Sequence, residues 1–334
     1  MTAETTTAPG PSGRRNRLVR ACLGAAVVVA LAAYAWSERD QLEPLDDARP
    51  GEVLLIAALV VVGNFCNSTE FWFLYRAVGV RSTVMENWLL FAAGQLGNHV
   101  PGQLGTLYRL RYMRVVHATP YARSASVYGA NFVVTLAGAS LMGMIALGGS
   151  ALTDGPAPLL LVAGFVTMGA AATAAAIVPL PRFASRQGRL ARGWQGFHEG
   201  WSSIVAAPRA GIAAIGLECA KYVVTAWRFQ LAFSLIGIEE SFWTFLVVAP
   251  TAGVAGFIAI TPGAIGIREG LMAFAASAMG STVSAGILGA TIDRAVLLLT
   301  SLVLGGAGFL LTGARLRARP RDQGASAARA ADMT

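Results

Sequence analysis

Long apolar runs separated by short polar segments dominate the chain. A run of about 20 apolar residues is long enough to cross the hydrocarbon core of a bilayer as a helix. Runs that approach or exceed this length cover residues 21–36, 53–74, 125–147, 159–178, 211–236 and 284–312. The pattern therefore predicts an all-α integral membrane protein, built as a polytopic helical bundle.

The amino-acid composition agrees with this assignment. The chain has 334 residues, of which 55% are apolar and only 13% are charged, and its mean hydropathy is +0.57. A soluble domain carries about 25% charged residues. This chain therefore lacks the polar residues that would cover a water-exposed surface.

The distribution of the formal net charge of +8 indicates a membrane topology. Basic residues gather in the short segments 76–81, 109–123, 182–209 and 315–321. Acidic residues dominate 38–52 and 239–240. Because Lys and Arg are retained on the cytoplasmic side, we expect both termini in the cytoplasm and a multi-pass protein in the plasma membrane. This distribution argues against a nucleic-acid partner.

The segments outside the apolar runs carry their own expectations. Residues 1–20 and 313–334 are rich in small and polar residues and are predicted to be disordered cytoplasmic tails around a transmembrane domain at 21–312. The 21–36 run is either a retained first helix, which we favour, or a cleaved signal peptide. Arginines spaced three and four apart in the 182–209 loop fit an amphipathic interfacial helix or a solvated loop.

Two apolar stretches are interrupted by a similar motif. Residues 87–97, too short to span, precede Pro-Gly-Gln-Leu-Gly at 101–105. Residues 242–260 end at Pro-Gly-Ala-Ile-Gly at 262–266, and the next apolar piece, 271–279, is again too short. Broken helices at membrane depth are tolerated where protein or water covers their free backbone groups. We predict two broken or re-entrant helix pairs; the alternative is simple turns between short packed helices.

The two motifs belong to a predicted internal repeat with copies at about 53–178 and 207–312. Flanking residues correspond, since Trp88 and Trp243 stand at similar positions in the two copies. Three predicted crossings separate the motifs, an odd number, so the second copy is inverted relative to the first. Inverted-topology repeats with paired broken helices are typical of transporters that bind their substrate near the bilayer midplane.

Ionisable residues within the predicted helices mark the bundle interior. Glu218, Lys221 and Arg228 have offsets of three and seven, which place them on one stripe of the 211–236 helix. Buried in a membrane, such groups need partners or water. A self-neutralising Glu218–Lys221 pair is the structural alternative to a binding role. Arg228 is expected to meet Glu70 or an anionic ligand, and a lipid phosphate suits arginine because the guanidinium binds phosphate bidentately.

Features typical of enzymes and metal proteins are weak. Cys22, Cys66 and Cys219 lie in apolar runs without metal-ligand or disulfide spacing, and no nucleotide-binding Gly-x-x-x-x-Gly-Lys-[Ser/Thr] motif occurs. His99 and His117 are candidates for a membrane-embedded enzyme, but no nucleophile–base spacing accompanies them. We therefore expect no catalytic residue, no metal and no other cofactor.

Two segments resemble the characteristic segments of the lysylphosphatidylglycerol synthase transmembrane family. The first is Asn-His-Val-Pro-Gly-Gln-Leu-Gly at 98–105, followed by Arg109. The second is Thr-Pro-Gly-Ala-Ile-Gly-Ile-Arg-Glu at 261–269, and Arg294 fits the family position after it. The resemblance covers roughly 53–312.

The chain departs from that family at two places. Gln103 stands where the family usually has Gly, and residues 130–135 are uncharged where the family usually carries Glu-Arg-x-x-Asp. The resemblance implies a flippase-like domain that moves a phospholipid head group between leaflets. In the full synthases a soluble aminoacyl-transferase domain follows the membrane region. This sequence carries the membrane portion alone, so we expect no aminoacylation.

We expect a lipid translocase or lipid-handling carrier that binds a phospholipid or a lipid-linked phosphate head group between the two repeats. The alternative is a non-catalytic membrane scaffold. Expected partners are membrane phospholipids, with a second copy of the chain or a separate synthase or glycosyltransferase as alternatives. The predicted substrate-binding residues are Asn98, Pro101, Gly102, Gly105, Arg109, Glu218, Lys221, Arg228, Pro262, Gly263, Gly266, Arg268, Glu269 and Arg294.

Overall fold

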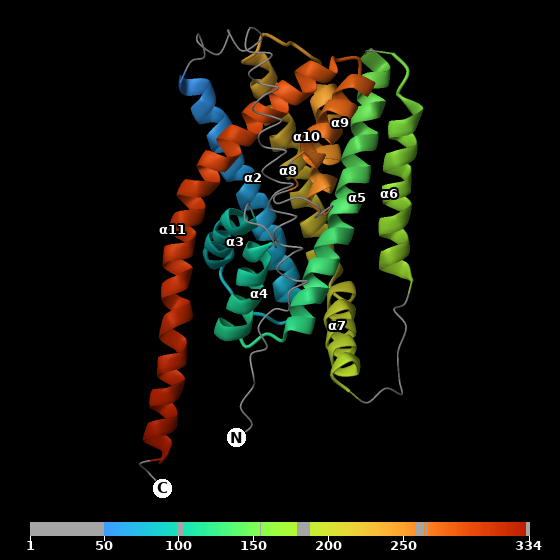
Figure 1. Cartoon of the computed structure of the whole chain (residues 1–334). Coiled ribbons are helices and arrows are strands. Elements are labelled where there is room, and N and C mark those ends of the chain that lie inside the picture. Colours follow the sequence, from blue (N-terminus) through green and yellow to red (C-terminus); the bar gives the residue numbers. More distant parts are fainter. Residues whose placement is uncertain are drawn as a thin grey trace, which may run out of the picture.

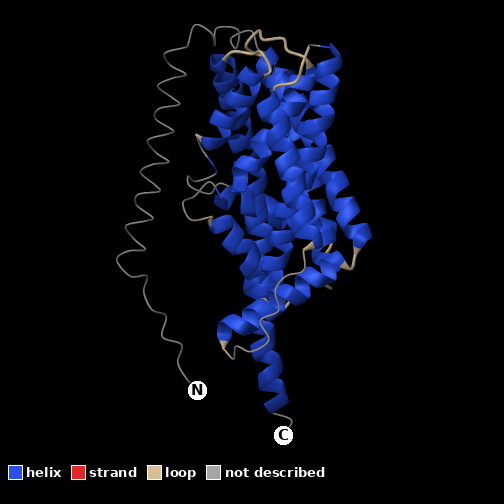
Figure 2. Cartoon of the chain, turned by 90° about the vertical axis from the view of Figure 1, so that its right-hand side faces the viewer, coloured by secondary structure: helices blue, strands red, loops and turns tan. Residues whose placement is uncertain are grey.

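Helices make up the regular structure of the part of the chain that the computed structural model describes, residues 50–98, 103–153, 155–178, 188–257, 264 and 266–331 (Figures 1 and 2). This confirms the predicted all-α class. The elements are α2 (Pro50–Ala77), α3 (Val84–Asn98), α4 (Leu104–Val116), α5 (Tyr121–Thr153), α6 (Leu159–Ile177), α7 (Arg189–Val205), α8 (Pro208–Ser234), α9 (Phe242–Val254), the short 3-10 turn η2 (Ala255–Phe257), α10 (Ile267–Ala278) and α11 (Val283–Ala331).

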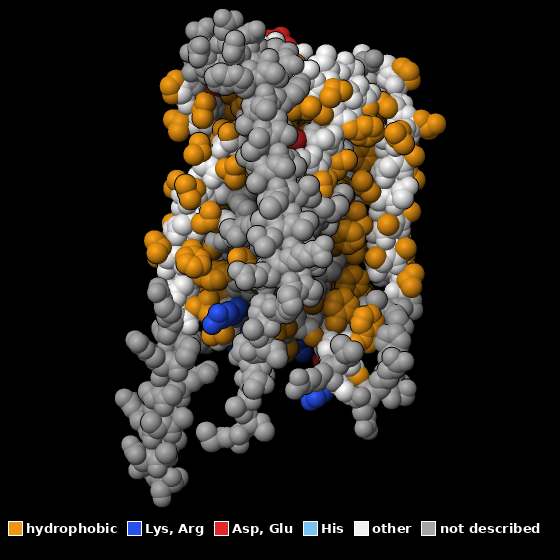
Figure 3. Space-filling view, in the orientation of Figure 1, with side chains coloured by type: hydrophobic (Ala, Val, Ile, Leu, Met, Phe, Trp, Pro, Cys, Tyr) orange, Lys and Arg blue, Asp and Glu red, His pale blue; other side chains and the backbone are white. Residues whose placement is uncertain are grey.

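Five of the described helices, α2, α5, α6, α8 and α11, are long and apolar enough to cross a membrane. Most residues of their apolar windows are not buried inside the protein, since the buried share is between 17% and 44%. Apolar side chains cover the flanks of the bundle (Figure 3), which is the surface that lipid tails require. The multi-pass prediction is therefore confirmed, while the 21–36 run and the N-terminal tail lie outside the described residues.

Two hairpins of short helices complete the bundle. The α3–α4 hairpin lies in the lower half of Figure 1, and the α9–α10 hairpin lies in the upper half. Glycine permits the close approach of α3 and α4, because a Cβ on Gly105 of α4 would overlap the carbonyl oxygen of Gly94 on α3. Asn98 reinforces it by accepting a hydrogen bond from the backbone N–H of Thr106 at 3.0 Å, in the first turn of α4.

The long helices pack on the hairpins in a crossed pattern. The first-half helices α2 and α5 pack on α8 and α9, and the second-half helix α11 packs on α3. Each hairpin is therefore held by a long helix from the other half of the chain. The main apolar core, which includes Tyr222, Phe229 and Phe245, lies among α5, α6, α8, α9, α10 and α11.

One segment differs from its expected form, and another takes one of the two forms that the sequence allows. Helix α11 continues beyond residue 312 to Ala331, where the sequence predicts a disordered tail. The tail is rich in Ala and Arg, which are among the strongest helix formers, so helix propensity outweighs its polar character. The 182–209 loop contains the amphipathic helix α7, which begins only at Arg189 and packs on α5. Its aromatic face includes Phe197 stacked on Trp201.

Candidate functional site

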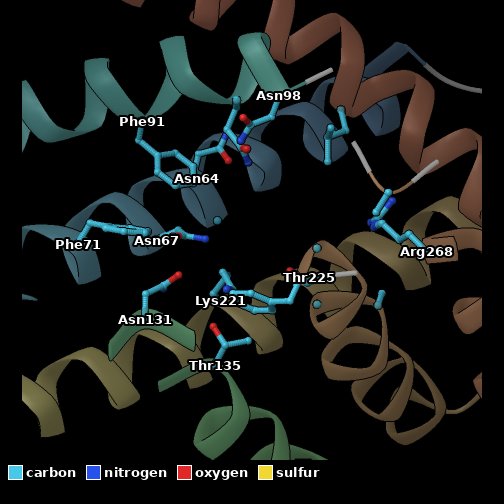
Figure 4. A pocket seen from close by; sticks show the side chains of 18 of the residues that line it. Asn64, Asn67, Phe71, Phe91, Asn98, Asn131, Thr135, Lys221, Thr225 and Arg268 are labelled. Atoms are coloured by element: carbon cyan, nitrogen blue, oxygen red, sulfur yellow. The ribbon is translucent and has the colours of Figure 1, made fainter. Parts of the chain in front are cut away.

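A cavity of about 500 Å³ lies in the middle of the bundle, between the two hairpins. Helices α2, α5, α8 and α11 line it together with α3, α4, α9, η2 and α10. Its wall combines amide side chains, aromatic rings and cations. Figure 4 shows Asn64, Asn67 and Asn131 around the same space as Lys221, with Arg268 across from them.

Most of the predicted binding residues that the structure describes meet at this cavity. Asn98, Arg109, Lys221, Arg228, Arg268 and Arg294 line it. Glu218 and Glu269 lie behind this layer and pair with cations of the wall. Gly105 lies in the first turn of α4, and Gly266 is the N-cap residue of α10. The remaining predicted residues, Pro101, Gly102, Pro262 and Gly263, lie outside the described residues.

Arg109 on α4 is held by aromatic rings instead of a carboxylate. Its guanidinium carbon lies 4.1 Å from the ring centre of Phe71, 4.9 Å from that of Phe91 and 5.3 Å from that of Tyr128. No acidic side chain of the described residues lies within ion-pair distance of it, although the residue is 7% exposed. Cation–π contacts stabilise a guanidinium without cancelling its charge. Arg109 therefore brings an uncompensated positive charge to the cavity.

Asp293 on α11 joins two arginines from different elements. It is fully buried, and its carboxylate accepts hydrogen bonds from Arg228 of α8 and from Arg268 of α10, the latter at 2.7 Å. The prediction that Arg228 meets Glu70 is therefore wrong. Glu70 is turned toward α5, where Asn131 donates a hydrogen bond to it at 2.5 Å. Helix α11 runs beside α8 and supplies the nearer carboxylate.

A second ion pair fixes the start of α10. Arg294 Nε donates to Glu269 Oε1 at 2.8 Å, and Glu269 Oε2 accepts from the backbone N–H of Gly266 at 2.7 Å. The carboxylate thus caps α10 and ties it to α11. Asp293 and Glu269 together neutralise much of the charge on the three arginines in this half of the cavity.

Lys221 and Glu218 form the ion pair that the structural alternative predicts, three residues apart on α8. Glu218 is fully buried, while the side chain of Lys221 is 17% exposed and lines the cavity. The pair therefore does not exclude a binding role, because its cationic end faces the ligand space. Five cations at the cavity, namely Arg109, Lys221, Arg228, Arg268 and Arg294, are opposed by four carboxyls, Glu70, Glu218, Glu269 and Asp293.

A separate polar cluster lies where the α3–α4 hairpin meets α11, and no pattern in the sequence predicts it. Glu86, in the first turn of α3, accepts a hydrogen bond from Tyr112 at 2.6 Å and lies 3.1 Å from His117 and 3.5 Å from Arg315. Burial raises the pKa of Glu86, but the bonds from His117 and Tyr112 outweigh it and lower the pKa to about 2. His117 thus serves this cluster, and the described residues contain no group of His, Cys, Asp and Glu suited to a metal.

The comparison with protein families agrees with the architecture. Residues 18–305 match the family described as the lysylphosphatidylglycerol synthase TM region. A search of curated proteins finds no match. The family match spans most of the chain, including all of the cavity-lining residues. The chain therefore belongs to the lysylphosphatidylglycerol synthase transmembrane-region family.

Proposed function

We propose that this protein is a membrane lipid-handling carrier, which binds the phosphate of a phospholipid or of a lipid-linked head group in the central cavity and moves it between leaflets. Membership of a family named for the membrane region of a lipid synthase supports a lipid-related role. The cavity supports a site for the polar part of such a lipid, because polar and cationic side chains line it in the middle of an otherwise apolar bundle.

The observation that carries this proposal is the uncompensated charge of Arg109. A buried cation without a carboxylate is costly in a membrane, and an anionic guest would remove the cost. Arg268 lies at the same cavity, and its Nη1 has no hydrogen-bond partner among the described residues. A phosphate between these two guanidinium groups would contact both hairpins at once.

The size of the cavity favours a head group as the bound part. A volume of about 500 Å³ falls within the range of about 300–1,000 Å³ that small-molecule sites occupy. The acyl chains of the lipid would stay along the apolar flanks of the bundle. The polar and apolar parts of the lipid would thus match the polar cavity and the apolar exterior of the protein.

The crossed packing of the hairpins supports movement between leaflets. The placement of α3–α4 and α9–α10 in opposite halves of the bundle, with each hairpin held by a long helix of the other half, is the arrangement that inverted repeats produce. We propose that the hairpins open the cavity alternately toward the two sides. The amides and cations of the wall would remain in contact with the head group throughout.

A reconstitution experiment tests the proposal. The protein is inserted into liposomes that contain a fluorescent phosphatidylglycerol, and an impermeant quencher reports transbilayer movement. We expect Arg109→Ala to slow this movement at least tenfold, Arg109→Lys to retain part of it, and Arg81→Ala, at an exposed position, to match the wild type. Wild-type rates for a folded Arg109→Ala variant would contradict the proposal. An inactive wild type that co-purifies with a synthase or glycosyltransferase would instead support the scaffold function.

A further inference from the structure

Two buried carboxyls meet at the contact between α2 and α8. Glu70 and Glu218 are both fully buried where α2 packs on α8, and the charge of each carboxyl acts on the other. Two buried ionised carboxylates that act on each other are costly unless a cation balances each of them. The pair is therefore a place where a proton can bind.

The groups around the pair balance only one of the two charges. Lys221 is the cation that acts on both carboxyls, and it forms an ion pair with Glu218. From α5, the neutral amide of Asn131 donates to Glu70 Oε1 at 2.5 Å. Glu70 Oε2 is buried and has no hydrogen-bond partner in the described part of the chain. The remaining titratable neighbours are the neutral Tyr222 phenol and the Cys66 and Cys219 thiols.

The same cluster forms part of the cavity wall. Lys221 and Asn131 both line the cavity, and Figure 4 shows them side by side at its edge. Lys221 therefore stands between the carboxyl pair and the space for a ligand. An anionic phosphate that enters this space competes with Glu218 for the ammonium group.

We propose that the Glu70–Glu218 pair is a proton-binding site linked to the cavity, so that the carrier takes up a proton when it binds a phosphate head group. When Lys221 turns toward the phosphate, the ammonium keeps its own protons and Glu218 loses its counter-charge. Glu70, which has no cation of its own, already holds a proton; Glu218 then takes up a second proton from water, because an ionised carboxylate without a counter-charge is too costly at this depth. This inference rests on the proposed function and adds the ion to which the lipid is coupled.

The linkage has a reciprocal consequence. If the anion favours binding of the proton, the proton must favour binding of the anion by the same factor. Coupling to one proton makes the affinity for the ligand change by up to about tenfold per pH unit, tighter at lower pH. A singly charged phosphodiester and a proton together add no net charge to the carrier, so a proton gradient can drive their movement in the same direction.

The experiment measures proton uptake by the full chain in detergent, in weak buffer with a pH indicator. The probes are a short-chain phosphatidylglycerol and, separately, inorganic phosphate. For the wild type we expect up to about one proton taken up per lipid bound, and tighter binding as the pH falls. Glu218→Gln removes the carboxyl that Lys221 leaves, and this variant should still bind the lipid, with several-fold less proton uptake and little pH dependence. Glu239→Gln removes a carboxyl at an exposed position and should behave as the wild type.

The outcomes separate this inference from the proposed function. Lipid binding by the wild type with no proton uptake and no pH dependence would overturn the proton site and leave the carrier function standing. Absence of binding by both probes would overturn both. Proton-linked binding of inorganic phosphate alone would support the proton site and overturn the lipid as its partner. If Glu218→Gln does not fold, the wild-type uptake measurement decides.

Discussion

The two hairpins break the membrane bundle in the same way but hold their arginines by different chemistry. In the α3–α4 hairpin, Arg109 lies among the rings of Phe71, Phe91 and Tyr128 and keeps its charge. In the α9–α10 hairpin, Arg268 is ion-paired with Asp293 of α11, and its Nη1 is left without a hydrogen-bond partner among the described residues. The first environment leaves a cation available to a guest, whereas the second uses the cation to join helices.

This difference suggests that the two hairpins have different roles, one in stability and the other in ligand binding. Ion pairs that cross from α10 and α8 to α11 fix the position of the second hairpin and cost much when they are broken. Aromatic contacts constrain Arg109 more softly, because their energy changes slowly with small movements of the guanidinium. We therefore expect substitutions in the second hairpin to affect mainly the stability of the protein. Substitutions around Arg109 in the first hairpin should affect mainly ligand binding.

The largest expected effect is on stability, from Asp293→Ala. Removal of this carboxylate leaves Arg228 and Arg268 buried without a counter-charge, which costs about 3–5 kcal/mol for a buried pair. We expect a large fall in the unfolding temperature in detergent, or loss of folded protein, and a smaller change for Arg109→Ala. Equal losses of stability in the two variants would break the comparison between the hairpins. Asp293→Asn is the matched control, because it keeps the shape and some hydrogen bonds.

A middle-sized effect is expected from Gly105→Ala in the first hairpin. The added methyl group overlaps the carbonyl oxygen of Gly94, so α3 and α4 must move apart. Overpacking of this kind costs about 1–3 kcal/mol, and the shift also displaces Arg109 from its rings. We expect a lower unfolding temperature and slower lipid movement in liposomes. Gly148→Ala is the control on α5, where nothing lies within 4 Å of the new methyl group, and it should leave both unchanged or raise stability.

Much of the fold could be predicted from the sequence, because membrane insertion depends on local hydrophobicity. The spans α2, α5, α6, α8 and α11 follow from apolar runs alone, and the Glu218–Lys221 pair follows from helical spacing. The hairpins also follow from local signals, since short apolar pieces next to Pro-Gly motifs predict breaks. In these cases the residues that decide the structure are neighbours in the sequence.

The partners of the arginines depend instead on packing between distant helices. Arg228 and Asp293 are 65 residues apart, and the choice of Asp293 over Glu70 depends on which faces of α8, α11 and α2 meet. The expected Arg228–Glu70 contact is not formed because the sequence does not show which helix faces meet. The aromatic site of Arg109 draws on α2, α3 and α5, and no motif in the sequence links these rings.

The smallest expected effect is from Glu86→Gln, at the other end of the first hairpin. There a carboxylate, and not a set of aromatic rings, stabilises the contact between helices. Glu86 has a pKa of about 2 in the folded protein, below the ordinary value of 4.5, because the bonds from His117 and Tyr112 outweigh its burial. A lowered folded-state pKa means that the carboxylate stabilises the fold fully above about pH 4.5, and that this contribution is lost as the pH falls toward 2. Glu86→Gln should therefore lower the unfolding temperature slightly at pH 7 and lose most of that difference from the wild type as the pH approaches 3. A difference that stays constant over this pH range would mean that shape, and not charge, accounts for the role of Glu86. The cluster joins α3 and α4 to Arg315 of α11. In that case it would hold these helices together by packing and not by charge. Arg109 would then be the one residue on which the contrast between the two hairpins depends.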